Sequence, residues 1–222
     1  MEIITNFLTS LSKLIAKKQN PIQWMFYFAV SLLIGGFSYT VFDRNTTGLW
    51  HELGSKAANL SMIAFLLTLI PGMIKRFKLQ GPFLPIRIMI MILRKEIGIL
   101  MFLLAFAHYG WSRVLPVLAI DGNLFRISLF EQFGLAALLM SFPMFLTSND
   151  YLIEKMGDWW KRLHSMAYII VWALFLHLVI REPSLKSIVV LIFAALEWTS
   201  LIKEKHDKNY SAGVSASTKS PI

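Results

Sequence analysis

The sequence predicts an all-α membrane protein, a six-transmembrane helix bundle with both termini cytoplasmic. Three observations lead to this fold class: the composition, six long blocks of uncharged residues, and the uneven distribution of basic residues. Hydrophobic residues make up 56% of the 222 residues and charged residues only 16%, whereas an ordinary soluble domain carries about 25% charged residues. This composition excludes a soluble enzyme, a disordered chain and a collagen-like chain.

The six apolar blocks approach the length of a membrane span, which takes about 20 mostly apolar residues. They cover residues 19–42, 57–74, 97–111, 132–149, 163–180 and 187–202, and only the last block contains a charge, Glu197. The first block is long enough to span and lacks a plain small-residue cleavage site, so no signal peptide is expected.

These blocks predict three regions in the chain. Residues 21–203 form the transmembrane domain, and residues 1–20 form a cytoplasmic segment before it. Residues 204–222 are polar and end in a run of small side chains, which predicts a disordered cytoplasmic tail. The loop between the second and third blocks contains Gly81, Pro82 and Pro85, which predict an extended or turning connection.

The basic residues set the predicted orientation. If the N-terminus is cytoplasmic, sixteen of the 22 Lys and Arg residues lie in cytoplasmic segments. The six on the other side are Arg44, Lys56, Arg113, Arg126, Arg181 and Lys186. Cytoplasmic loops carry an excess of Lys and Arg, so this orientation is the expected one. The net charge of +9 therefore indicates contact with the lipid bilayer and not with nucleic acid.

The residue types limit the chemistry that the chain can support. It has no cysteine, which excludes disulfides, thiolate zinc sites, iron–sulfur clusters and covalently attached c-type haem. It also has no GxGxxG motif and no P-loop, and the short loops leave no extramembrane domain to hold a nucleotide. Any redox cofactor must be held by other ligands.

The histidines inside the predicted spans are the candidate ligands. Three of the five histidines, His108, His164 and His177, fall inside the apolar blocks. Ionisable residues at membrane depth are costly and usually face the bundle interior, where they mark functional sites. Each histidine taken alone could have a structural role, as a buried side chain that hydrogen-bonds to a neighbouring helix. Three histidines with a coherent geometry favour a functional role.

The spacing of these histidines predicts two sites stacked across the membrane. His177 follows His164 by thirteen residues, about 20 Å along a helix, so the two cannot ligate one iron. His108 follows Arg94 by fourteen residues on a span with the same direction, which places His108 and His177 at matching depth. Two imidazoles facing each other from neighbouring helices are suited to bis-histidine haem b. A spacing of thirteen also separates His164 and His177 by about 140° around an ideal helix, so tilt or deformation of that helix is needed.

The predicted inner site is incomplete as a second bis-histidine site. At the depth of His164 the third span offers Arg94 and Lys95, which cannot ligate iron but can pair with a haem propionate or a flavin phosphate. Trp159 and Trp160 lie at the same level, either as an aromatic belt or as a stacking site for a flavin or quinone.

Two further histidines are weaker candidates. His206 lies in the predicted tail, which makes it a poor candidate for a ligand. His51 stands beside Glu52 near the start of the second span. We expect it to cap that span or to line the exit of the electron path, with the structural role favoured.

Four segments carry a resemblance to a known family. They are His51-Glu-Leu-Gly54, Arg94-Lys-Glu-Ile-Gly98 followed by His108, Leu146-Thr-Ser148, and Gly157-Asp-Trp-Trp-Lys-Arg-Leu-His164-Ser-Met-Ala-Tyr168 followed by His177. In order and spacing they resemble the ferric-reductase-like transmembrane domain. Within it they are similar to the MsrQ subfamily, the haem-binding membrane subunits of bacterial methionine sulfoxide reductase systems.

The resemblance implies a function. It implies one or two b-type haems, with His108, His164 and His177 at the positions of the family's haem histidines. It also implies electron transfer in a bacterial inner membrane. The donor would be a cytosolic flavin reductase or a quinol, and the acceptor a periplasmic MsrP-like methionine sulfoxide reductase. The NADPH oxidases are similar too, but they carry two histidines on the third span and a fused flavin domain, whereas Arg94 stands here in place of the first histidine.

We therefore expect a haem b electron-transfer subunit, which is a component of an oxidoreductase rather than a complete enzyme. FMN and quinone are further candidates for the cofactor of the inner site. Three alternatives stay open. The chain could be a stand-alone ferric or oxygen-reducing transmembrane reductase. It could be a haem-binding sensor or carrier without electron flow. It could also be a transporter whose histidines relay protons.

Overall fold

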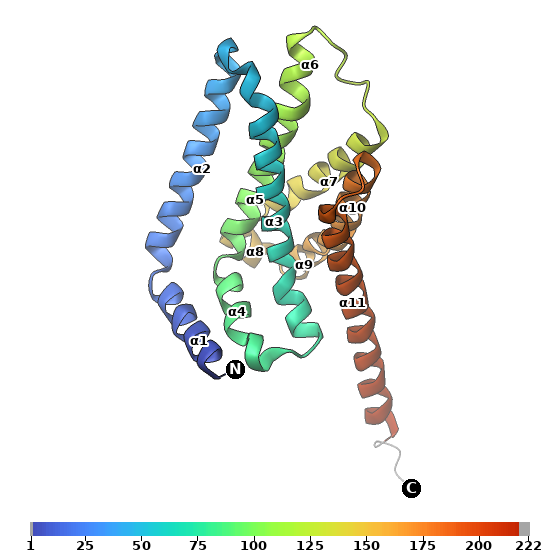
Figure 1. The fold of residues 1–222 in the computed structure, drawn as a ribbon. Coiled ribbons are helices and arrows are strands. Elements are labelled where there is room, and N and C mark those ends of the chain that lie inside the picture. Colours follow the sequence, from blue (N-terminus) through green and yellow to red (C-terminus); the bar gives the residue numbers. More distant parts are fainter. Residues whose placement is uncertain (1, 218–222) are drawn as a thin grey trace.

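The computed structural model describes residues 2–217, and in this part of the chain it contains helices and no strand (Figure 1). The α-helices are α1 (Glu2–Lys17), α2 (Gln19–Phe42), α3 (Trp50–Arg76), α4 (Gln80–Ile92), α5 (Arg94–Tyr109), α6 (Leu115–Ala119), α7 (Leu129–Leu146), α8 (Asp150–Met156), α9 (Asp158–His164), α10 (Ala167–Arg181) and α11 (Leu185–Ser217). A 3₁₀ segment, η1 (Arg44–Leu49), precedes α3, and a π-helical segment, η2 (Gly110–Val114), joins α5 to α6.

Six helical stretches are long and apolar enough to cross a membrane, which confirms the predicted six-span helical bundle, while the cytoplasmic orientation of both termini stays a prediction. They are Gln19–Phe42, Thr46–Arg76, Arg94–Ala119, Leu129–Leu146, Asp158–Arg181 and Leu185–Tyr210. Both ends of the described chain lie at the same end of the bundle (Figure 1).

The core of the bundle lies between α3, α10 and α11. α3 packs mainly against α5, and α10 packs against α7 and α11. The buried residues of this core are Phe65, Leu66, Leu69, Met73, Ala167, Ile170, Val171, Val190 and Ala194. A second buried cluster joins η2 to the N-terminal half of α3 and the C-terminal half of α5, and its members are Trp50, Ala57, Leu104, Ala107 and Trp111. The histidine-bearing helices α5 and α10 are thus held by apolar packing on both sides.

Helix α2 is attached more loosely, at the edge of the bundle (Figure 1). Among its described side chains only Thr40 is buried, and Thr40 accepts a 2.7 Å hydrogen bond from the indole of Trp111. Near its other end Gln23 donates a 2.6 Å hydrogen bond to the buried Glu96 of α5. Two polar contacts therefore fix α2 where apolar packing is sparse.

The helices deviate from ideal geometry next to two of the three membrane histidines. His164 is the last residue of α9, and a turn at residues 165–166 separates it from α10. This break supplies the deformation that the thirteen-residue spacing to His177 requires. His108 lies just before η2, and π-helical turns are frequent at functional sites because they redirect the side chains beside them.

The connection between α3 and α5 was predicted as an extended or turning loop, and this prediction is wrong. Residues 80–92 form α4, which packs against α1 and α3. Pro82 is the third residue of α4, where the first-turn N–H groups have no helical partner, so its missing donor costs little. Pro85 loses only the bond to Gly81, and the apolar run that follows maintains the helix.

The predicted disorder of the C-terminal tail also differs from the structure over most of its length. Residues 204–217 continue α11 as helix, and residues 218–222 lie outside the described part of the chain. Lys208 pairs with Glu204 one turn earlier at 2.8 Å, and Asp207 pairs with Lys78 at 2.7 Å. These contacts favour helix in a polar segment. The predicted limits of the transmembrane domain, and the cytoplasmic location of residues 1–20, stay predictions.

Candidate functional site

His108 of α5 and His177 of α10 lie against each other in the half of the bundle farthest from the chain ends. Their ring centroids are 6.5 Å apart and the ring planes make an angle of 75°. The structure therefore brings together the two residues whose matching depth follows from counting residues along their helices.

Each of the two rings is held by a backbone carbonyl. His108 Nδ1 lies 2.9 Å from the carbonyl oxygen of Gly54, and His177 Nδ1 lies 2.8 Å from that of Phe130. A carbonyl oxygen can only accept, so Nδ1 of each neutral ring must donate, and the lone pair is left on Nε2. Ser112 Oγ lies 3.2 Å from His108 Nδ1 and adds a second acceptor. This is the usual way in which proteins fix the tautomer of a metal-binding histidine.

The separation of the rings fits two axial ligands of one iron. An imidazole nitrogen lies about 2 Å from a metal that it ligates, so two rings on opposite sides of one ion have centroids about 6 Å apart. Within residues 2–217 no group of three or more His, Cys, Asp or Glu side chains could hold a metal ion. A haem needs only two, because the porphyrin supplies the other four nitrogens.

Glycines provide the space that the rings occupy. A Cβ atom at Gly134 of α7 would lie 2.7 Å from His177 Nδ1 and 2.9 Å from its Cε1. A Cβ atom at Gly54 of α3 would collide with the hydroxyl of Ser112, the residue that contacts His108. The close approach of α7 to His177 therefore depends on the absence of a side chain at Gly134. The close approach of α3 to Ser112, beside His108, depends in the same way on Gly54.

We expect Gly134→Ala to weaken haem binding. The new methyl group would push the His177 ring off the Phe130 carbonyl. Loss of such a supporting contact typically lowers metal affinity about 10- to 100-fold. Titration of haem into the cofactor-free variant measures the effect. Gly36→Ala on α2, where a Cβ meets nothing within 4 Å, is the control, and equal affinities of the two variants would contradict the assigned role.

His164, the last residue of α9, lies beyond the end of α10 opposite His177 and in a different environment. Its ring stacks on the indole of Trp160, with centroids 3.9 Å apart and an interplanar angle of 26°. Its Nε2 is 3.3 Å from Thr147 Oγ1, and Trp160 donates to the carbonyl of Thr147 at 3.1 Å. Thr147, just after α7, thereby positions both rings. Because Thr147 Oγ1 already bonds to the Pro143 carbonyl at 2.8 Å, it is placed to accept from Nε2 and leave Nδ1 with the lone pair.

Arg94 is a half-buried cation without a partner. Its guanidinium forms no hydrogen bond or ion pair within the described residues, yet it lies close enough to His164, Tyr168 and Glu197 to act on them electrostatically. Lys95 differs, because its ammonium group pairs with Asp150 at 2.8 Å. Of the two predicted anion-binding residues, only Arg94 lacks an ion pair among the described residues.

His51 is not brought to either histidine site. It is exposed in the first turn of α3, and the N-cap of that helix, Leu49, has no side-chain capping bond. The structure therefore does not support the predicted capping role. The adjacent Glu52 instead pairs with Lys56 at 2.6 Å.

Arg181 lies near the His108–His177 pair, and its sequence position did not indicate this. It lies within electrostatic range of both His108 and His177. Its guanidinium carbon lies 6.0 Å from the ring centroid of Phe130. In the sequence, Arg181 is only one of the six basic residues outside the predicted cytoplasmic segments.

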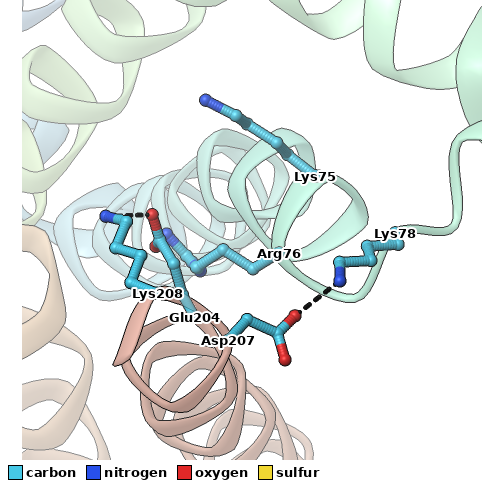
Figure 2. Close-up of a pocket in the computed structure, with 6 residues that line it drawn as sticks. All are labelled: Lys75, Arg76, Lys78, Glu204, Asp207 and Lys208. Carbon is cyan, nitrogen blue, oxygen red and sulfur yellow. Dashed lines mark ion pairs between the residues drawn. The ribbon is translucent and has the colours of Figure 1, made fainter. Parts of the chain in front are cut away.

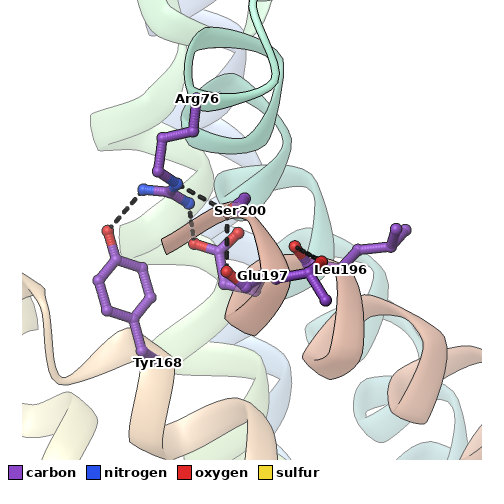
Figure 3. A network of polar contacts seen from close by, with 6 residues as sticks. Arg76, Tyr168, Leu196, Glu197 and Ser200 are labelled. Carbon is purple, nitrogen blue, oxygen red and sulfur yellow. Dashed lines mark hydrogen bonds and ion pairs between the residues drawn. The ribbon is translucent and has the colours of Figure 1, made fainter. Parts of the chain in front are cut away.

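A buried polar network joins α3, α10 and α11 (Figure 3). Arg76 of α3 forms an ion pair with Glu197 of α11, and it donates to Ser200 at 2.7 Å and to the hydroxyl of Tyr168 at 2.9 Å. Glu197 is 1% exposed, and its second carboxylate oxygen has no partner among the described residues. The sequence marked Glu197 as the one charge in an apolar block but did not indicate its partner.

Known proteins resemble most of this chain. Residues 53–175 match the family described as ferric reductase like transmembrane component. The protein-methionine-sulfoxide reductase heme-binding subunit MsrQ of Brucella anthropi is 27% identical over 168 residues, which cover 74% of this chain and 67% of that protein. MsrQ of Brucella ovis has the same identity and coverage. MsrQ of Agrobacterium fabrum is 27% identical over 127 residues, 52% of this chain and 59% of that protein.

No solved structure shows a significant match. The family match covers more than half of the chain and includes His108 and His164, while His177 lies two residues beyond its end. Together with the six spans it confirms a multi-pass membrane location. The chain therefore belongs to the family of ferric reductase-like transmembrane components.

Proposed function

We propose that the chain is a haem b-binding electron-transfer subunit of a bacterial inner membrane. It receives electrons at its cytoplasmic face from a flavin reductase or a quinol. It delivers them to a periplasmic reductase, of which a methionine sulfoxide reductase is the candidate named by its relatives. The observation that carries the proposal is the pair of rings His108 and His177, each fixed by a carbonyl so that Nε2 keeps its lone pair.

His108 and His177 would hold the haem, each through the Nε2 atom that its carbonyl contact leaves with a lone pair. Bound haem would supply reversible one-electron chemistry in a part of the membrane where no side chain of this cysteine-free chain can. The Phe130 ring, with its centroid 5.7 Å from that of His177, and the apolar cluster around Leu104 and Trp111 exclude water from the pair. Arg181, within electrostatic range of both histidines, would pair with a propionate.

Arg94 and His164 would serve a second carrier nearer the cytoplasm, either a haem or a flavin. An arginine without an internal partner is costly at this depth unless an anion pairs with it, and its fork of donors suits a propionate or a phosphate. Trp160 and Thr147 keep the imidazole of His164 beside it. The inner site is therefore built to hold an anionic cofactor group by charge, with at most one histidine ligand.

Replacing Arg94 with alanine should leave the outer haem spectrum intact. It should slow reduction of that haem from the cytoplasmic side by about tenfold, as expected for removal of a supporting contact. Stopped-flow absorbance measures the rate, and cofactor extraction measures the inner occupancy. Arg162→Ala is the control, because Arg162 is an exposed cation of the same end that packs on Trp159. If Arg94→Ala changes neither the reduction rate nor the occupancy of the inner cofactor, Arg94 is only a basic residue at the membrane interface.

The function itself is tested in sealed vesicles that contain the purified protein. A reporter fused after Ile222 establishes which face is exposed, and it should report the cytoplasmic face if the orientation is as proposed. A membrane-impermeant reductant at that face should reduce the outer haem and, through it, an acceptor on the opposite side. Failure of reduction would favour a haem sensor or carrier. Reduction of a ferric chelate or oxygen without a partner protein would favour a stand-alone reductase.

A further inference from the structure

A pocket of about 360 Å³ lies between the C-terminal end of α3 and the extension of α11 (Figure 2). It is lined by Lys75, Arg76, Lys78, Glu204, Asp207 and Lys208. Arg76 is the last residue of its span, and Glu204 follows the start of α11 by nineteen residues, about 28 Å of helix. Because the hydrocarbon core is about 30 Å thick, the pocket lies at the depth of the lipid headgroups.

The floor of the pocket is a fixed guanidinium. The side chain of Arg76 is 8% exposed and is held from behind by Glu197, Tyr168 and Ser200. Gly72 makes room for it, since a Cβ atom there would lie 3.0 Å from Arg76 Nη2. Arginine has five N–H donors, and the three bonds described use three of them. Two donors remain without an acceptor in the described part of the chain.

The rim carries an excess of positive charge. Lys78 pairs with Asp207 and Lys208 with Glu204, but the ammonium group of Lys75 forms no ion pair or hydrogen bond among the described residues (Figure 2). The pocket thus has four cationic and two anionic side chains. Exposed ion pairs of this kind contribute little and open readily, so the lysines can turn to a stronger acceptor.

We propose that this pocket binds the headgroup of an anionic phospholipid such as phosphatidylglycerol. Basic pockets between transmembrane helices at the headgroup level select anionic lipids. The lipid phosphate accepts from Arg76 and from the free Lys75. The phosphate group comes from a bilayer lipid and not from a soluble anion. Just before the pocket α11 exposes Trp198 and Ile202, and these apolar side chains place the adjacent surface in contact with acyl chains. The proposal does not depend on haem binding.

Native mass spectrometry and thermal unfolding of the purified, cofactor-containing protein in detergent test this inference. Phosphatidylglycerol should stay bound and raise the unfolding temperature, whereas phosphatidylcholine and inorganic phosphate should do neither. The double variant Lys75→Gln/Lys208→Gln should bind phosphatidylglycerol at least tenfold more weakly, because each basic residue near an anionic lipid contributes about a factor of five.

The matched control is Lys155→Gln/Lys161→Gln, which removes two exposed lysines outside the pocket and should bind phosphatidylglycerol like the unaltered protein. Equal protection by phosphatidylcholine, or undiminished binding in the pocket variant, would overturn the proposal. Protection by inorganic phosphate alone would also overturn it and would identify a site for a soluble anion.

Discussion

Replacing either His108 or His177 with alanine is expected to remove the same low-spin haem signal. The ring centroids of the two histidines are 6.5 Å apart, so both residues would hold the same haem and loss of either would remove one of its two protein ligands. We expect near-complete loss of the bis-histidine absorption spectrum and of the corresponding electron paramagnetic resonance signal in both variants.

Two other histidines provide controls for this result. His51→Ala should keep the full signal, because His51 is exposed and contacts neither ring. His164→Ala should also keep the outer haem, since His164 stacks on Trp160 in the inner half of the bundle. A full low-spin spectrum in either His108→Ala or His177→Ala would show that the pairing is wrong.

Glu197→Ala is expected to cause a large loss of stability. It would leave Arg76 as a buried cation without its carboxylate, and breaking one side of a buried ion pair costs about 3–5 kcal/mol. The free energy of unfolding in mixed micelles measures this loss. The outer haem should retain its spectrum in the folded variant, because the network lies at the opposite end of α10.

Two variants define the origin of this effect. Glu52→Ala removes one partner of the exposed pair with Lys56 and should change stability little. The double variant Arg76→Met/Glu197→Leu should recover much of the loss, because apolar replacement of a buried pair is often tolerated. If Glu197→Ala unfolds no more easily than Glu52→Ala, the network does not stabilise the bundle.

The positions of the spans could be predicted because lipid imposes a simple rule on composition and length. Each of the six apolar blocks overlaps one of the six long apolar helical stretches, and block 19–42 has the same limits as α2. The matching depth of His108 and His177 followed from the constant rise per residue of a helix. These inferences need only local sequence and the geometry of one helix at a time.

The remainder of the site depends on contacts between distant segments. Nothing near His177 in the sequence indicates that the carbonyl of Phe130 holds its ring or that Gly134 must lack a side chain. The turn at residues 165–166 and the π-helical segment that begins at Gly110 lie inside apolar blocks with no proline to mark them. Local patterns could not have located them.

The polar network shows a case in which a signal was present but incomplete. Glu197 interrupts an apolar block, and an isolated carboxylate at membrane depth requires a partner. Arg76 is 121 residues away in the chain and counted in the sequence only as one of many basic residues at a span end. Tyr168 belongs to the segment that resembles the family, but its hydrogen bond to Arg76 depends on how α3 and α10 pack.

The most direct test of the central claim is an absorption spectrum of the purified protein with haem quantified per chain, in the oxidised and dithionite-reduced states. The account predicts a six-coordinate, low-spin haem b and at least one haem per chain, ligated by His108 and His177. Absence of a Soret band after purification with haem supplied would contradict it, and so would a five-coordinate, high-spin spectrum.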